Sequence, residues 1–125
     1  MIKITLEKAI YLHGILSKEA GTNPGLRDIG LLESAIEGAY QTFGGTELYP
    51  TVEEKGAWLG YALISNHAFV DGNKRIGALI MLTFLELNGI KLRLSDKELV
   101  DLILGVASGE IKYEGLLSVI SEKID

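Results

Sequence analysis

Hydrophobic residues recur along the chain at the spacing of amphipathic helices, and capping residues and glycines separate the segments. A first helix is predicted from residue 6 to about Gly21, and a second is predicted to begin after Asp28 and to close before Gly44. Residues 51–54, Thr-Val-Glu-Glu, form a capping box, which predicts a third helix from there to about His67.

The second half of the chain continues this pattern. Residues 76–87 are apolar on nearly every side, which is typical of the helix at the centre of a core. A second capping box at 95–98 predicts a helix that ends near Gly109, and a last helix is predicted over 113–124. Between the central helix and this capping box, apolar and basic residues alternate over 90–94, which indicates a short extended segment.

Five to six helices without strands between them predict an all-α helical bundle rather than a doubly wound sheet. At 125 residues the chain has the length of one domain, so residues 1–125 are predicted to form a single unit. The longest apolar stretch is about half of the ~20 residues that a membrane-spanning helix needs. Because the chain also lacks cysteine and an apolar signal segment, we expect a cytoplasmic protein with no membrane partner.

The charge distribution narrows the classes of ligand. A net charge of −5 is the wrong sign for a protein that neutralises a polyphosphate backbone, so direct binding of nucleic acid is not expected. Acidic residues predominate from Asp28 to Asp71, and the basic pair Lys74-Arg75 follows them. An isolated basic pair suits a small anion better than it suits a nucleic-acid backbone.

The candidate chemistry lies in the nine residues from His67 to Arg75, directly before the most apolar helix. Free amides and the dipole at a helix N-terminus bind phosphate-like groups, and two cations in the first turn would add charge at the same place. The simpler interpretation is a polar turn in which Asp71 or Asn73 only caps the helix. Each residue alone favours that simpler interpretation, whereas the combination favours a phosphate site.

The same nine residues resemble the Fic/Doc family, whose signature is H-x-F-x-D/N-x-N-x-R. The matching positions are His67, Phe69, Asp71, Asn73 and Arg75. Most Fic proteins have glycine before the arginine, whereas the Doc branch, known as death-on-curing toxins, reads N-K-R, as this chain does with Lys74. The segments 25–28, 31–35 and 105–111 also read like Doc sequences.

The resemblance implies a role for each matching residue. His67 is the expected general base, and histidine readily exchanges a proton near neutral pH. Asp71 is the expected ligand of Mg²⁺, which one or two carboxylates and substrate phosphates can hold together. The residues expected to bind the phosphates of ATP are Gly72, Asn73, Lys74 and Arg75, and Lys74 and Arg75 are also expected to act in catalysis. Phe69 and His13 are predicted to be core residues.

The Doc resemblance further implies a toxin that phosphorylates a Ser/Thr hydroxyl of a translation protein, elongation factor Tu, with Mg-ATP. It implies as a partner an antitoxin whose disordered segment folds on binding. Two alternatives remain open at this point. One is AMP transfer, as in the glycine version of the motif; the other is an inactive helical binding module, because Ala68 and Ile76 depart from the common pattern.

Overall fold

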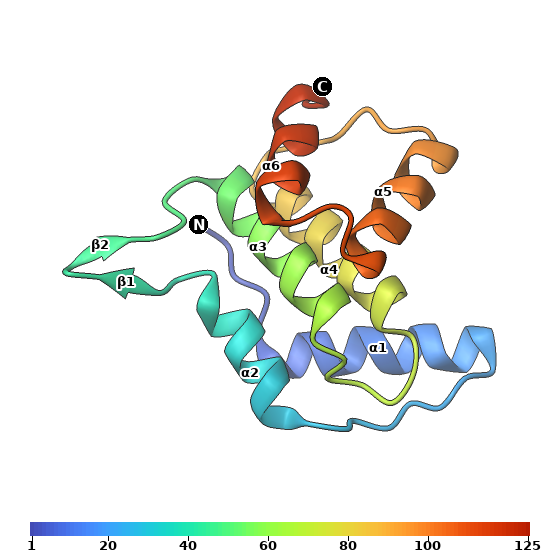
Figure 1. Cartoon of the computed structure of the whole chain (residues 1–125). Coiled ribbons are helices and arrows are strands. Elements are labelled where there is room, and N and C mark those ends of the chain that lie inside the picture. The colour runs from blue at the N-terminus through green and yellow to red at the C-terminus, as the bar shows by residue number, and fades with distance from the viewer.

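The computed structural model describes residues 1–125 and consists of six helices and one short hairpin (Figure 1). In chain order the elements are α1 (Leu6–Ala20), α2 (Ile29–Gly38), β1 (Thr42–Phe43), β2 (Thr46–Glu47), α3 (Val52–Ser65), α4 (Asn73–Leu87), α5 (Asp96–Ser108) and α6 (Tyr113–Glu122). The predicted helical bundle is therefore confirmed. None of these helices has the length and apolar character needed to cross a bilayer.

Four helices begin where their capping residues predict. Thr5 and Asp28 accept hydrogen bonds from the third main-chain amide of α1 and α2, at 3.1 Å each. Thr51 and Ser95 head complete capping boxes at the start of α3 and α5, since a glutamate three residues later accepts a hydrogen bond from the cap's own amide. These bonds satisfy amides of the first turn that have no partner inside the helix.

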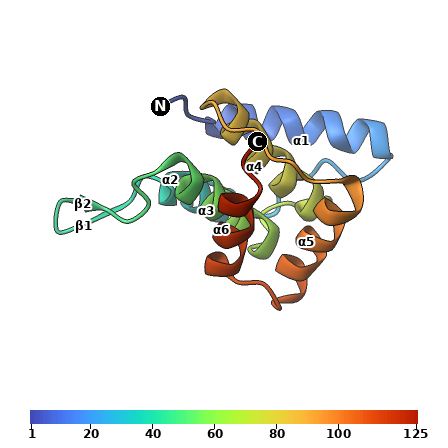
Figure 2. The ribbon, with the colours of Figure 1, turned by 90° about the horizontal axis from the view of Figure 1, so that it is seen from above.

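The helices α3 and α4 lie side by side through the middle of the molecule, with α1 across one end and α5 and α6 beside them (Figures 1 and 2). Glycines let the two axes approach closely. A β-carbon on Gly60 of α3 would lie 2.6 Å from the sulfur of Met81, and one on Gly77 of α4 would lie 2.6 Å from the Ile64 side chain. The prediction that residues 76–87 form the central core helix is confirmed.

The pair α3 and α4 separates two clusters of buried apolar side chains. The first cluster joins α1 and α2 to this pair and includes Leu32, Leu63, Phe69, Ile76 and Ile80. The second joins α5 and α6 to it and includes Ile64, Met81, Leu85, Val106 and Leu116. Because Phe69 belongs to the segment between α3 and α4, the first cluster anchors that segment from inside.

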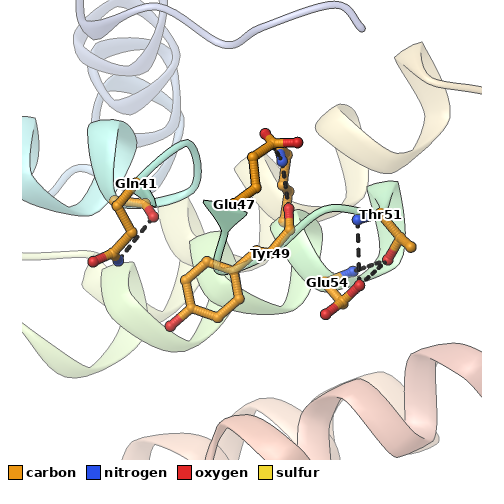
Figure 3. A network of polar contacts seen from close by, with 7 residues as sticks. Gln41, Glu47, Tyr49, Thr51 and Glu54 are labelled. Atoms are coloured by element: carbon orange, nitrogen blue, oxygen red, sulfur yellow. Dashed lines mark hydrogen bonds and ion pairs between the residues drawn. The ribbon is translucent and has the colours of Figure 1, made fainter. Parts of the chain in front are cut away.

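The hairpin β1–β2 was not predicted, because Gly44-Gly45 had been interpreted only as the end of a helix. Both glycines have positive φ, 60° and 83°, as a two-residue hairpin turn requires. The buried ammonium of Lys55 holds the base of the hairpin: it donates to Glu47 at 2.8 Å and to the Tyr49 carbonyl. Figure 3 shows Glu47 and Tyr49 beside the capping box that starts α3.

Residues 90–94 do not form a strand of their own. They run beside the C-terminal residues and make a single antiparallel bridge, between Leu92 and Ile124. The main-chain amide of Arg93 donates to the Lys123 carbonyl at 2.7 Å, and that of Asp125 donates to the Lys91 carbonyl at 2.8 Å. The alternating pattern therefore corresponds to a segment that closes over the second core cluster, with Leu92 packed against it.

Candidate active site

The segment between α3 and α4 carries the motif and lies at the end of the molecule that α1 crosses (Figure 1). The helix α3 ends at Ser65, and the chain reverses at His67, the one non-glycine residue with positive φ, at 55°. Gly72, with φ of 77°, then starts α4. A non-glycine residue in this backbone region costs of order 1–3 kcal/mol and persists only where its surroundings hold it.

The polar side chains of the motif surround one cavity of about 460 Å³. The residues that line it are Ile64, His67, Val70, Asp71, Gly72, Asn73, Lys74, Arg75 and Ala107. All six site residues predicted from the sequence are among them. The structure therefore brings the expected base, metal ligand and phosphate-binding cations together around one space, with Ala107 of α5 on its wall.

The N-terminus of α4 opens into this group of residues. Its N-cap is Gly72, which supplies no side-chain cap, and the first hydrogen bond of the helix runs from the Ile76 amide to the Gly72 carbonyl, at 3.0 Å. The preceding main-chain amides, at residues 73–75, are left for an external acceptor. Amides of this kind, together with the helix dipole, favour an anion such as phosphate.

Asn73 contributes its side chain to the structure of the loop itself. Its side chain is used inside the loop: Nδ2 donates to the Phe69 carbonyl at 3.0 Å, and Oδ1 accepts from the Phe69 amide at 3.0 Å. One of the two N–H groups of Nδ2 is thus engaged, and the other N–H group and the main-chain amide have no partner in the loop. The same pair of bonds fixes the loop around the buried Phe69 ring.

Residues 25–28, just before α2, hold the first half of the loop. The amides of Arg27 and Asp28 both donate to the Ala68 carbonyl at 2.9 Å, and the Val70 amide donates to the Gly25 carbonyl at 2.9 Å. The Arg27 side chain adds a bond from Nε to the His67 carbonyl at 2.7 Å. This short antiparallel pairing joins segments about forty residues apart.

His13 of α1 holds the second half. Its Nε2 lies 2.7 Å from the Asp71 carbonyl, and its ring stacks on Phe69 with centroids 3.7 Å apart. Because a carbonyl only accepts, Nε2 carries the hydrogen, and the buried Nδ1 has no partner. The prediction that His13 is a buried, hydrogen-bonded residue is confirmed, and its partner proves to be the motif loop.

Asp71 fits the role of a magnesium ligand. One of its oxygens, Oδ1, accepts from the Gly72 amide at 2.9 Å, which orients the exposed carboxylate at the edge of the cavity. No group of three or more histidine, aspartate or glutamate side chains converges in the chain. A single carboxylate beside the cations Lys74 and Arg75 could hold Mg²⁺ together with a nucleotide, because this ion needs only one or two carboxylates when phosphates and water complete its ligands.

Sequence reasoning missed the residues that support the loop from a distance. In the sequence, Arg27 is visible only as part of a segment that resembles the family. No sequence pattern indicates the hydrogen bond from Asn66 Nδ2 to the Leu31 carbonyl, which connects the end of α3 to α2. Val70 and Ala107 complete the cavity wall without any polar group. The motif residues can be recognised from their spacing in the sequence, whereas the supporting contacts join segments that only the fold brings together.

Comparison with known proteins identifies the family of the chain. The sequence model of the Fic/DOC family matches residues 3–85. The chain is 43% identical over 67 residues to "Toxin Doc" of Mycolicibacterium smegmatis, a match that covers 54% of this chain and 52% of that protein. It is 32% identical over 116 residues to "Protein kinase doc" of Escherichia phage P1, covering 93% and 90% of the two chains. The chain belongs to the Fic/Doc family, and these relatives place it beside the Doc proteins.

Proposed function

We propose that this chain is a Doc-like toxin that transfers the γ-phosphoryl group of ATP to a Ser/Thr hydroxyl of a protein, elongation factor Tu. The observation that carries the proposal is the arrangement of His67, Asp71, Lys74 and Arg75 around one cavity at the N-terminus of α4. Similarity to proteins named as a toxin and as a protein kinase supports both parts of the proposal.

The chain's residues divide the reaction between them. His67 accepts the proton of the attacking hydroxyl, the hydroxyl oxygen bonds to the γ-phosphorus, and the bond to the bridging oxygen breaks so that ADP leaves. Lys74, Arg75 and the free amides of α4 bind the phosphate oxygens and counter their charge. Asp71 would hold Mg²⁺, which would supply positive charge against that of the phosphates.

Lys74 favours phosphoryl transfer over AMP transfer. Lysine adds a positive charge and a long side chain to the lining of the cavity, where the family's AMP-transferring members have glycine. Its ammonium suits the γ-phosphate as a point charge, and Arg75 beside it can bind two oxygens in a planar fork. The nucleotide would therefore present its outer phosphate to the acceptor.

The test uses the purified chain, a bacterial lysate and ATP labelled separately at the α- and γ-phosphates. Label from the γ-phosphate alone on one protein, lost in His67→Ala, is the expected result. Label from the α-phosphate would instead assign AMP transfer. Retention of every activity, including growth arrest, in His67→Ala would favour the inactive binding module.

The proposal includes a partner and a place in the cell. A toxin of this kind requires a neutralising antitoxin, and we expect one whose disordered segment folds on binding. The target and the nucleotide are cytoplasmic, so the chain is expected to act there. Co-expression with a neighbouring small open reading frame that restores growth would identify the antitoxin.

A further inference from the structure

The backbone at His67 requires support from elsewhere in the fold. The position follows the C-cap of α3, where a left-handed residue commonly ends a helix and glycine is the usual choice. Here a histidine adopts φ of 55°. A residue with a β-carbon remains in this region only when its neighbours hold it, and such residues concentrate at functional sites.

Arg27 supplies the contact nearest to this strained backbone. Its Nε donates to the His67 carbonyl at 2.7 Å, and Nη2 lies 3.5 Å from the Asn66 carbonyl. The side chain is exposed, pairs with no carboxylate and does not line the motif cavity. Both of its polar contacts are therefore with the main chain of residues 66 and 67, and the shorter one is with His67 itself.

We propose that Arg27 is a positioning residue for His67: its Nε–H holds the His67 carbonyl so that the backbone stays left-handed and the imidazole stays in the cavity. This inference rests on the proposed function, in which His67 is the base. Without the bond, the chain after α3 gains freedom to relax toward the more common negative φ, which moves the ring away from the acceptor hydroxyl.

Two substitutions separate the hydrogen bond from charge and bulk. Arg27→Met keeps an unbranched side chain of similar reach and removes every donor. Arg27→Gln removes the charge but places an amide nitrogen the same number of bonds from Cα as Nε, so the bond to His67 can form again. Because Arg27 is exposed, neither variant disturbs the core. Arg93→Met is the matched control, since Arg93 is exposed and pairs only with Asp125, at 3.5 Å.

Two readouts are needed. The kcat and KM of γ-phosphoryl transfer report the chemistry, and the Cα and Cβ chemical shifts of His67 report its backbone conformation whether or not transfer occurs. We expect Arg27→Met to lower kcat by roughly ten- to hundredfold with little change in the KM for ATP, as small misplacements of a catalytic group do. The His67 shifts should move away from left-handed values, Arg27→Gln should restore both readouts, and Arg93→Met should change neither.

Several results would overturn the inference. Unchanged His67 shifts in Arg27→Met would show that the bond does not hold the backbone, and changed shifts with an unchanged kcat would show that it does not position the base. Equal losses in Arg27→Met and Arg27→Gln would assign the effect to the positive charge. A parent protein that transfers no γ-phosphate would refute the proposed function instead, and the chemical shifts would still decide whether Arg27 holds His67.

Discussion

The close approach of α3 and α4 predicts that replacing a helical glycine by alanine stabilises the protein at one position and destabilises it at another. Alanine in place of a helical glycine gains about 1 kcal/mol of helix propensity. At Gly14 of α1 a β-carbon would meet nothing within 4 Å, so Gly14→Ala should keep this gain. At Gly77 of α4 it would lie 2.6 Å from a side-chain carbon of Ile64 and 3.0 Å from its main-chain nitrogen, and the backbone cannot yield cheaply. Overpacking of this kind costs about 1–3 kcal/mol, so Gly77→Ala should be destabilised by up to about 2 kcal/mol net.

Urea unfolding followed by circular dichroism measures the free energy of unfolding for both variants against the parent. For a chain of 125 residues, 1 kcal/mol corresponds to about 4 °C in Tm, so thermal unfolding should show shifts of opposite sign. Gly60→Ala is an intermediate case, because its β-carbon would meet the flexible Met81 side chain. A Gly77→Ala protein as stable as Gly14→Ala would refute the helix packing described here.

Three further results are expected. His13→Phe keeps the stack on Phe69 but removes the donor to the Asp71 carbonyl, so unfolding free energy should fall by about 1 kcal/mol in a denaturant titration; no change would discount this bond. Glu47→Ala removes the half-exposed counter-charge of the buried Lys55 ammonium and should cost about 2 kcal/mol, more than Lys55→Met does; the reverse order would contradict this ion pair. The pKa of Glu98 is lowered from 4.5 to about 2, first because its carboxylate accepts a hydrogen bond from the Ser95 amide and second because it accepts one from the Lys123 ammonium. Since that pKa is lower in the folded state, the stabilisation by the ionised Glu98 carboxylate is complete above pH 4.5 and is lost as the pH falls toward 2. The free energy of unfolding of Glu98→Gln should therefore fall less steeply over this pH range than that of the parent.

Local signals predicted most of the fold. Capping boxes at Thr51 and Ser95 and the cap at Asp28 act within one helical turn, so the sequence alone places these helix starts. The nearly uniform apolar character of residues 76–87 also identified the central helix, because a helix that is mostly buried carries few polar residues.

Features that depend on distant contacts escaped prediction. The Gly44-Gly45 turn fits both a helix stop and a hairpin, and the interactions of Lys55 at the hairpin base become visible only in three dimensions. The engagement of the Asn73 side chain with Phe69 was hidden because the same amide suits a phosphate equally well. Likewise, no local pattern connects Arg27 to His67, since they meet through a pairing across forty residues.

The mass of the modified acceptor is the most direct test of whether the loop from His67 to Arg75 transfers a phosphoryl group. Elongation factor Tu is incubated with the purified chain and Mg-ATP, and its intact mass is measured. We expect a gain of one phosphoryl group on a serine or threonine, absent with His67→Ala. A gain of AMP, or an acceptor that remains unmodified while the chain still arrests growth, would contradict it.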